Sequence, residues 1–208
     1  MKVAAARSSE ALWRTARRLR PRRRFGKAPP RLIFFTDPLR TPDPAAVIAR
    51  LPRGAGVVYR AFGAAGALAE GRRLARAARS RGVVFLVGAD PALASRLMAD
   101  GVHLPERLAM RAVGLRRQRP GWLVTCAAHS LAAIVQARRA GAHAVIVSPV
   151  FPSRSPSAGR PLGAIRFAAL AGAAGLPVVA LGGIRSDTAP QLLASGAAGL
   201  AVVEGLLG

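Results

Sequence analysis

Residues 122–147 read WLVTCAAHSLAAIVQARRAGAHAVIV, and this stretch decides the fold. It opens with a short apolar run at 122–126 and closes with a second one at 144–147, both of which are typical of β-strands. Between them, Ala, Leu and Arg recur at helical spacing over 131–140. A strand, a helix and a strand in this order form a βαβ unit whose two strands lie parallel in one sheet.

The same alternation recurs along the rest of the chain. Short apolar runs occur at 31–36, 56–60, 83–87, 102–104, 122–126, 144–147, 177–181 and 199–203. The segments between them include 67–80, 92–98, 131–140, 164–173 and 188–194, each short enough to be one crossover helix. Because crossovers between parallel strands are right-handed, eight consecutive βα units close naturally into a barrel. We therefore expect an α/β fold, a single (β/α)8 TIM barrel over residues 31–208, with an open doubly wound sheet as the alternative.

The two ends of the chain depart from this pattern. Residues 1–30 are expected to form a basic amino-terminal extension that is partly helical, since 8–19 has helical spacing. The chain stops at Gly208, directly after the eighth apolar run, so the eighth helix is expected to be missing or vestigial. We expect the extra helix to cover the amino-terminal end of the barrel. A bare strand favours aggregation, so we also expect that helix or a partner subunit, as in a homodimer, to cover the exposed flank.

Composition limits the possible partners. The 208 residues, 51% of them hydrophobic, suffice for one sizeable core. The formal net charge is +23, but arginines are spread over every expected helix, as on solvated outer faces. Only 14–31 is concentrated enough to act as a basic tail. The sequence therefore argues against a nucleic-acid partner, with contact of that tail to RNA, DNA or an anionic membrane as the alternative.

The same composition bears on cellular location. None of the apolar runs approaches the roughly 20 uninterrupted residues of a membrane-spanning helix, so we expect no membrane span. The Arg-rich beginning lacks the long apolar centre of a secretory signal. Cys126 is the one cysteine, which excludes an internal disulfide and is consistent with a reducing compartment. We expect a cytoplasmic protein in which Cys126 is a small buried residue rather than a nucleophile.

Functional groups of such barrels lie at the carboxyl ends of the strands. The seventh apolar run leads into Gly182 and Gly183, and the eighth into Val203 and Glu204. The loops after these two strands commonly form a phosphate cup from backbone amides, and glycine lets an anion approach the backbone closely. We predict a phosphate-binding site here. The alternative is that the two glycines only relieve a tight turn.

Several motifs resemble those of the thiamine phosphate synthase/TenI family. They are DGVHL at 100–104, His129-Ser130, GAH at 141–143, SPVFPS at 148–153 with PLG at 161–163, and the segments 177–184 and 196–203. The resemblance covers about residues 31–205 and is most specific at 148–153. It implies a (β/α)8 barrel, thiazole phosphate as the small-molecule ligand and a place in thiamine biosynthesis. It also implies that Ser153 and Ser155 bind the thiazole phosphate, and that Glu204 replaces a small serine beside the phosphate, where an inward-pointing carboxylate would repel the ligand.

The synthase of this family couples an aminomethylpyrimidine diphosphate to a thiazole phosphate, and magnesium neutralises the departing pyrophosphate. Most residues that the resemblance assigns to this half of the site are replaced. At 58–62 the family's arginine remains as Arg60, which we expect to bind the substrate or its phosphate, whereas the family's glutamine and lysine are lost. The other losses fall at Gly88-Ala89, Leu108, Ala127 and Pro156. We therefore expect no metal site and no required cofactor, with magnesium held by Asp90 and Glu106 as the alternative.

The chain has three histidines, and one of them matches a catalytic position. TenI proteins shift a proton on a carboxythiazole phosphate tautomer so that its ring becomes aromatic, and imidazole is suited to giving and taking a proton near neutral pH. His129 lies at the TenI histidine position, so it is the candidate acid/base. A structural role beside Ser130, a plausible helix cap, is the alternative. We expect His103 to be structural and His143 to lie at the opposite end of the barrel.

These observations lead to one expected function and two alternatives. We expect a TenI-like protein that binds thiazole phosphate and acts as a thiazole tautomerase. The first alternative is a thiamine phosphate synthase with a rebuilt diphosphate site. The second is a catalytically inactive ligand-binding barrel.

Overall fold

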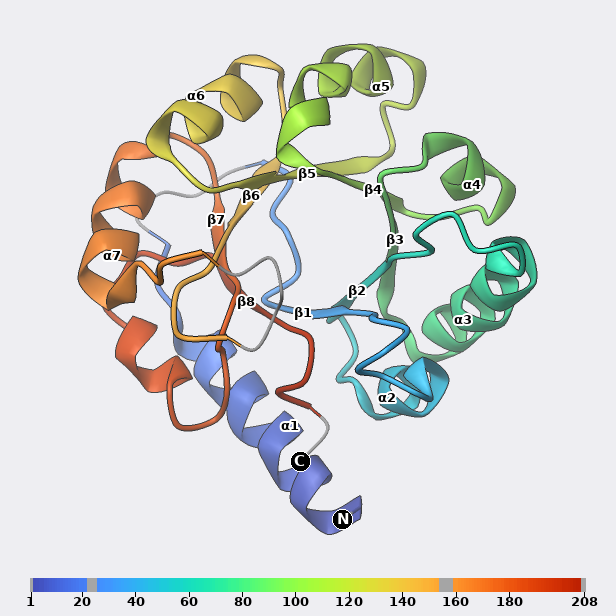
Figure 1. The fold of residues 1–208 in the computed structure, drawn as a ribbon, viewed down its shortest axis with the longest axis horizontal. Helices are drawn as coiled ribbons and strands as arrows, with labels where there is room; N and C mark the ends of the chain where they lie inside the picture. Colours follow the sequence, from blue (N-terminus) through green and yellow to red (C-terminus); the bar gives the residue numbers. More distant parts are fainter. Residues whose placement is uncertain (1, 22–25, 154–158, 207–208) are drawn as a thin grey trace.

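A closed barrel of eight parallel strands forms the centre of the computed structural model, which describes residues 2–21, 26–153 and 159–206 (Figure 1). Each strand pairs with the next one in the chain, and β1 pairs with β8 to close the ring. The strands are β1 Leu32–Phe35, β2 Gly56–Tyr59, β3 Val84–Gly88, β4 Gly101–Leu104, β5 Leu123–Ala128, β6 Ala144–Val147, β7 Val178–Ala180 and β8 Gly199–Val202. The (β/α)8 prediction is confirmed, and the open-sheet alternative is excluded.

Helices surround the barrel and connect successive strands (Figure 1). They are α2 Pro44–Arg50, α3 Ala67–Arg81, α4 Pro91–Arg96, η1 Glu106–Arg111, α5 Ala112–Gln118, α6 Leu131–Arg139, α7 Gly163–Ala173 and η2 Ala189–Leu192. The connection after β7 differs from the expected α-helix over 188–194, because η2 is a four-residue 3-10 helix. It contains Pro190, which cannot donate a backbone hydrogen bond.

Two apolar layers hold the barrel together. Alternate strand residues fill its interior: Ile33, Phe35, Val58, Leu86, Leu123, Ile146, Val179 and Ala201. Their neighbours along each strand point outward and pack with the buried faces of the helices. The interior is therefore a packed core, and open space for a ligand lies above it, beyond the carboxyl ends of the strands.

Helix α1, Lys2–Arg18, lies against the flank between β8 and β1 and contacts η2 (Figure 1). Near its beginning the hydroxyl of Ser8 donates to the carbonyl of Gly205, beyond the carboxyl end of β8. At its other end the carbonyl of Leu19 accepts from Arg31, which precedes β1. The expected extra helix is present, but it runs along the open flank rather than across the amino-terminal end of the barrel. Its buried residues are Leu12 and Ala16, followed by Leu19 just beyond the helix.

No helix follows β8 within the described residues, and α1 covers the flank that such a helix would occupy. The expectation that the extra helix covers the exposed flank therefore agrees with the structure. A barrel strand that would otherwise be bare is shielded from solvent by the helix that precedes the first strand.

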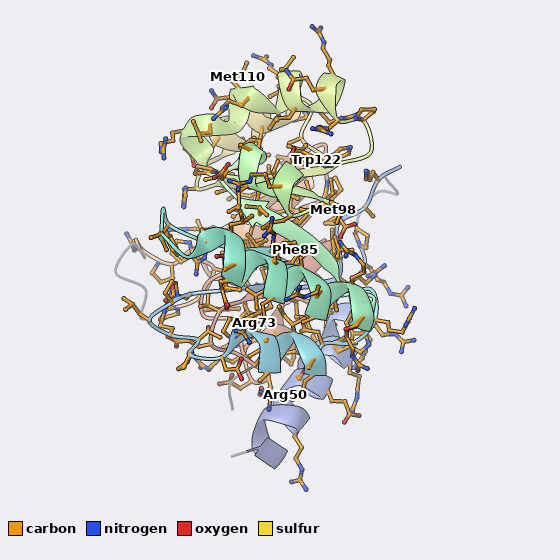
Figure 2. All side chains as sticks on the ribbon, turned by 90° about the vertical axis from the view of Figure 1, so that its right-hand side faces the viewer. Arg50, Arg73, Phe85, Met98, Met110 and Trp122 are labelled. Atoms are coloured by element: carbon orange, nitrogen blue, oxygen red, sulfur yellow. The ribbon has the colours of Figure 1, made fainter. Side chains whose placement is uncertain are left out.

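The charged residues lie mainly on the outside. Arg50 and Arg73 are exposed on α2 and α3, whereas Phe85 of β3 is buried (Figure 2). In the described ranges, no helix combines the length and the apolar character that crossing a membrane requires.

Candidate active site at the barrel mouth

A cavity of about 560 Å³ lies at the carboxyl ends of β7 and β8. Five residues that the sequence singled out line it: Ser153, Gly182, Gly183, Val203 and Glu204. Ser155 lies outside the described residues. The structure thus brings the two strand tips and the loop after β6 together around one space. This volume is in the usual range of small-molecule sites, roughly 300–1,000 Å³.

Gly182 and Gly183 shape one wall of this cavity. Both have positive φ, +93° and +64°, which favours glycine. A Cβ on Gly182 would lie 2.8 Å from Cα of Pro149, and one on Gly183 would lie 2.5 Å from the carbonyl oxygen of Pro152. Glycine is therefore required because the loop after β6 packs on the tip of β7. From the sequence we expected glycine here because a side chain would block the approach of the anion. In the structure, a side chain would instead collide with the loop after β6.

Backbone donors are available beside the two glycines. Within the described part of the chain, the N–H groups of Gly183 and Ile184 donate to no protein acceptor. The hydroxyl of Thr188 accepts from the N–H of Arg185 at 2.9 Å and donates to the carbonyl of Gly183 at 2.8 Å. This bridge fixes the turn after β7, so its amides are held in place for an anion.

Arg40 contributes a positive charge to the cavity and was not predicted from the sequence. It follows β1 and lines the same space as Gly183 and Glu204. Asp37 orients it, because that carboxylate accepts from the Arg40 guanidinium at 2.8 Å and from the Arg40 backbone N–H at 3.1 Å. Its place three residues after Asp37, in the loop that follows the first strand, was the signal that could have identified it.

Asp37 remains a carboxylate between two guanidinium groups. Burial acts to raise its pKa, but the hydrogen bonds from Arg40 and the charges of Arg40 and Arg60 outweigh burial and lower that pKa below its usual value. The second guanidinium, that of Arg60, donates to Asp37 at 3.1 Å. Asp37 therefore ties the tips of β1 and β2 together.

Glu204 faces the cavity rather than away from it. Its carboxylate lies 3.8 Å from Nε of Arg40, so a row of alternating charges runs from Arg60 through Asp37 and Arg40 to Glu204. The sequence left two alternatives, an outward carboxylate or impaired phosphate binding. The structure adds a third possibility, in which the charge of an inward carboxylate is partly offset by Arg40.

Arg60 lies at the mouth but does not line the cavity. Its Nε donates to the carbonyl of Thr36 at 2.7 Å, and its guanidinium lies over the rings of Phe35 and Phe62. These contacts give it a role in ordering the strand tips. Direct contact with a ligand remains a prediction.

His103 lies deeper, on the interior face of the barrel. Its Nδ1 is 3.0 Å from the hydroxyl of Thr125, and its ring meets Phe35 edge to face. Burial, with a smaller contribution from Arg60, lowers the pKa of His103 to about 3. A neutral, hydrogen-bonded ring in the core agrees with the structural role predicted for it.

His129 stands at the tip of β5, outside the cavity lined by β7 and β8. Its Nδ1 lies 2.7 Å from Oε2 of Glu106, and its backbone N–H donates to the same oxygen at 2.9 Å. The helix cap is Ser130, whose hydroxyl accepts from the N–H of Ala133 at 3.1 Å. Since the cap is supplied by Ser130, the His129 ring is left to interact with Glu106 and solvent.

The surroundings of His143 and Cys126 favour structural rather than catalytic roles. His143 accepts a hydrogen bond from the N–H of Val124 at the amino end of the barrel, and its pKa is lowered to about 4 by burial and by Arg116 and Lys27. Burial raises the pKa of Cys126 to about 12, so its thiol is a poor nucleophile.

The two residues of the magnesium alternative, Asp90 and Glu106, each have a protein partner in the structure. Asp90 caps α4, because its Oδ1 accepts from the N–H of Leu93 at 2.8 Å. Glu106 is hydrogen-bonded to His129. Within the described ranges, no three His, Cys, Asp or Glu side chains gather closely enough to hold a cation. Magnesium is usually held by one or two carboxylates together with substrate phosphates, so binding by Asp90 or Glu106 stays a prediction.

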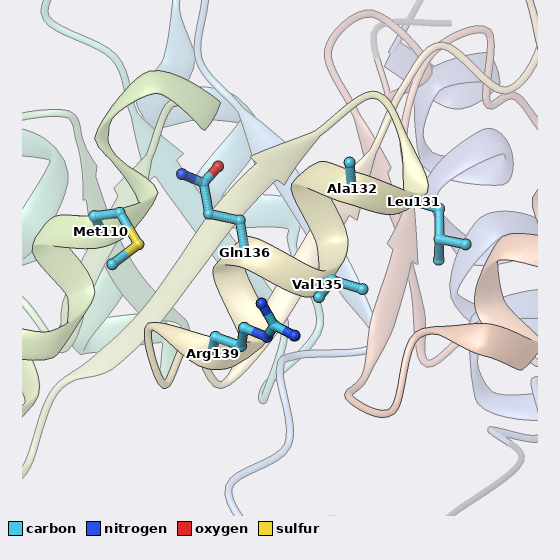
Figure 3. A pocket seen from close by; sticks show the side chains of 6 residues that line it. All are labelled: Met110, Leu131, Ala132, Val135, Gln136 and Arg139. Atoms are coloured by element: carbon cyan, nitrogen blue, oxygen red, sulfur yellow. The ribbon is translucent and has the colours of Figure 1, made fainter.

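A second cavity, of about 660 Å³, lies on the outside of the barrel between η1 and α6 (Figure 3). Met110 faces it from η1, and its remaining lining comes from α6: Leu131, Ala132, Val135, Gln136 and Arg139. It is mostly apolar, and none of its lining residues comes from the tips of β7 or β8. It is therefore not part of the candidate active site.

Comparison with known proteins identifies the family. The family model for thiamine monophosphate synthase (TMP-TENI) matches residues 35–206. The bifunctional thiamine biosynthesis protein ThiED of Geobacter sulfurreducens is 32% identical over 145 residues, which cover 67% of this chain and 29% of that protein. The thiamine-phosphate synthase of Chlorobium luteolum is 34% identical over 146 residues, which cover 65% of this chain and 68% of that protein. The chain thus spans less than a third of the bifunctional relative and about two-thirds of the synthase.

A solved structure agrees with these sequence matches. The thiamine phosphate pyrophosphorylase from Pyrococcus furiosus superposes with a TM-score of 0.72 at 25% identity, over 84% of this chain and 85% of that one. The family-model match over residues 35–206 includes the strand tips that line the cavity. On these grounds, the chain belongs to the thiamine monophosphate synthase family.

Proposed function

We propose that the protein binds a thiazole phosphate in the cavity at the tips of β7 and β8 and acts as a thiazole tautomerase, with His129 as the acid/base. One observation carries the proposal. The described residues of the phosphate half line one cavity, whereas the two carboxylates left in the diphosphate half, Asp90 and Glu106, are engaged in other contacts. The proposed activity needs the first half of the site and not the second.

The chemistry fits a single proton-transfer group. Tautomerisation removes a proton from the ring system and returns one at another position, so no bond to phosphate breaks and no oxidant is required. One imidazole can accept the proton and then give it back. In this proposal the amides near Gly183 and the guanidinium of Arg40 hold the phosphate. The thiazole ring of the ligand then extends across the barrel mouth toward His129 at the tip of β5.

The second candidate is thiamine phosphate synthesis, which the names of the relatives favour. A relative at 34% identity is named thiamine-phosphate synthase. In this reading the chain would couple a pyrimidine diphosphate to the thiazole phosphate and release pyrophosphate. The amino-terminal end of the barrel has no part in either candidate.

A two-arm assay distinguishes the candidates. In the first arm the protein is incubated with the carboxythiazole phosphate tautomer, and conversion to the aromatic isomer is followed by NMR. In the second arm it receives the aromatic thiazole phosphate, the pyrimidine diphosphate and magnesium, and pyrophosphate is measured. Conversion in the first arm supports the proposal. Turnover in the second arm alone would replace it with the synthase, and binding without turnover in either arm would leave an inactive ligand-binding barrel.

Arg40→Ala is expected to weaken thiazole phosphate binding by roughly tenfold to a hundredfold, because a hydrogen bond to a charged group contributes about 1.5–3 kcal/mol. The substitution removes one of the two guanidinium groups that line the cavity, the other being that of Arg185, and takes away the Arg40 charge beside Glu204. Calorimetric titration measures the effect. Arg50→Ala on the exposed face of α2 is the matched control and should bind like the unmodified chain. Equal affinities for all three proteins would remove Arg40 from the site.

Glu204→Ser is expected to tighten thiazole phosphate binding by about tenfold, because it removes the repulsion between the carboxylate and the phosphate. A repulsion strong enough to shift a pKa by one unit corresponds to about 1.4 kcal/mol, which is a factor of ten in affinity. The change removes a carboxylate that lines the cavity and provides a hydroxyl that can donate to phosphate. The same titration, repeated at high salt, should show a smaller difference because salt screens the repulsion. A loss of affinity would mean that Glu204 assists binding.

A further inference from the structure

We infer that Glu106 positions the imidazole of His129 for proton transfer by holding its Nδ1, so that Nε2 is the nitrogen presented to the substrate. The inference rests on the proposed function, in which His129 is the acid/base. From the sequence, Glu106 was predicted only as an alternative magnesium ligand. Its contacts instead make it a partner of His129.

The geometry defines which nitrogen carries the proton. Oε2 of Glu106 lies 2.7 Å from Nδ1 of His129. A carboxylate can only accept hydrogen bonds, so the neutral ring must place its proton on Nδ1. Nε2 then holds the lone pair that can take a proton from a substrate, and the carboxylate stabilises the ring while it is charged.

A second bond anchors Glu106 independently of the ring. The backbone N–H of His129 donates to the same Oε2 at 2.9 Å. Glu106 is the first residue of η1, directly after Pro105, and η1 contacts both β5 and α6. The carboxylate is thus fixed to the tip of β5, and the ring is oriented relative to the strand that carries it.

A merely stabilising ion pair would behave differently. The two side chains are 55% and 38% exposed, and ion pairs in such surroundings contribute little to stability. Loss of Glu106 should therefore leave the melting temperature nearly unchanged. An effect on turnover without an effect on stability is the expected signature of positioning.

Glu106→Ala is expected to lower kcat for the tautomerisation by roughly tenfold to a hundredfold, the cost that is usual for losing a carboxylate that orients a metal-binding histidine, with KM unchanged. Glu106→Gln keeps an oxygen that accepts from Nδ1–H and from the backbone, so its kcat should lie between those of Glu106→Ala and the unmodified chain. Glu70→Ala, which removes an exposed carboxylate paired with Arg73 on α3, is the matched control.

Nitrogen NMR provides a readout that does not depend on turnover. The chain has only three histidines, so the ring signals of His129 can be assigned with a His129→Ala variant. The unmodified chain and Glu70→Ala should show the Nδ1–H tautomer at alkaline pH. Glu106→Ala should shift His129 toward the Nε2–H tautomer.

The outcomes separate the two proposals. If His129→Ala abolishes turnover while Glu106→Ala keeps full kcat, the inference is overturned and the proposed function stands. If His129→Ala turns over normally, both are overturned. An Nε2–H tautomer in the unmodified chain would also overturn the inference, whatever the rates.

Discussion

His129→Ala is expected to lower kcat/KM for isomerisation of the carboxythiazole phosphate by about 10²–10⁴-fold, the usual contribution of a positioned acid/base. The affinity for the aromatic thiazole phosphate should change little, because His129 does not line the cavity between the tips of β7 and β8. Single-turnover kinetics give the rate, and calorimetric titration gives the affinity. A fall in rate at constant affinity would place the effect in the chemical step.

The controls test whether the imidazole itself is responsible. His143→Gln changes a histidine at the amino end of the barrel and should leave kcat/KM unchanged. Added imidazole should partly restore turnover by His129→Ala, because truncation leaves space where the ring stood. The hypothesis fails if His129→Ala and the unmodified chain isomerise the substrate at equal rates.

Much of the fold could be predicted from the sequence because the barrel repeats one local pattern. Each apolar run with its following helical segment is a complete βα unit, and chirality then leaves few ways to arrange eight of them. The position of α1 could be predicted only in part, since the sequence suggested both the exposed flank and the amino-terminal end of the barrel as surfaces that it covers. Its apolar stripe, with Leu12 and Ala16, shows that one face is buried but does not specify which surface covers it.

The candidate site could be predicted only in part, for a related reason. Gly182, Gly183, Val203 and Glu204 follow directly from strand ends, and the structure brings them to one cavity. The pairing of Glu106 with His129 joins residues 23 positions apart, across two neighbouring strand tips. Such a contact depends on how the loop after β4 folds over β5, which periodicity does not specify. Arg40 was missed because its position depends on Asp37 and on the tip of β8.

Gly183→Ala is expected to destabilise the protein by about 2–5 kcal/mol, a large share of the 5–15 kcal/mol of a typical domain. Two costs combine. An alanine at φ +64° is strained by about 1–2 kcal/mol, and its Cβ would lie 2.5 Å from the carbonyl oxygen of Pro152 and 2.7 Å from Cβ of Phe151. Overpacking of this kind costs about 1–3 kcal/mol. Urea unfolding measures the change in the free energy of unfolding.

Gly54→Ala separates strain from collision. Gly54 has φ +78°, close to that of Gly183, but a Cβ there would meet nothing within 4 Å. It should lose only the strain, about 1–2 kcal/mol. Equal losses of stability in the two variants would rule out the collision as a cause of the destabilisation.

Where Gly183→Ala remains folded, thiazole phosphate binding should still weaken. Relief of the collision must move either the tip of β7 or the loop after β6, and both are walls of the cavity. Gly54→Ala should bind normally, since its turn lies outside that cavity.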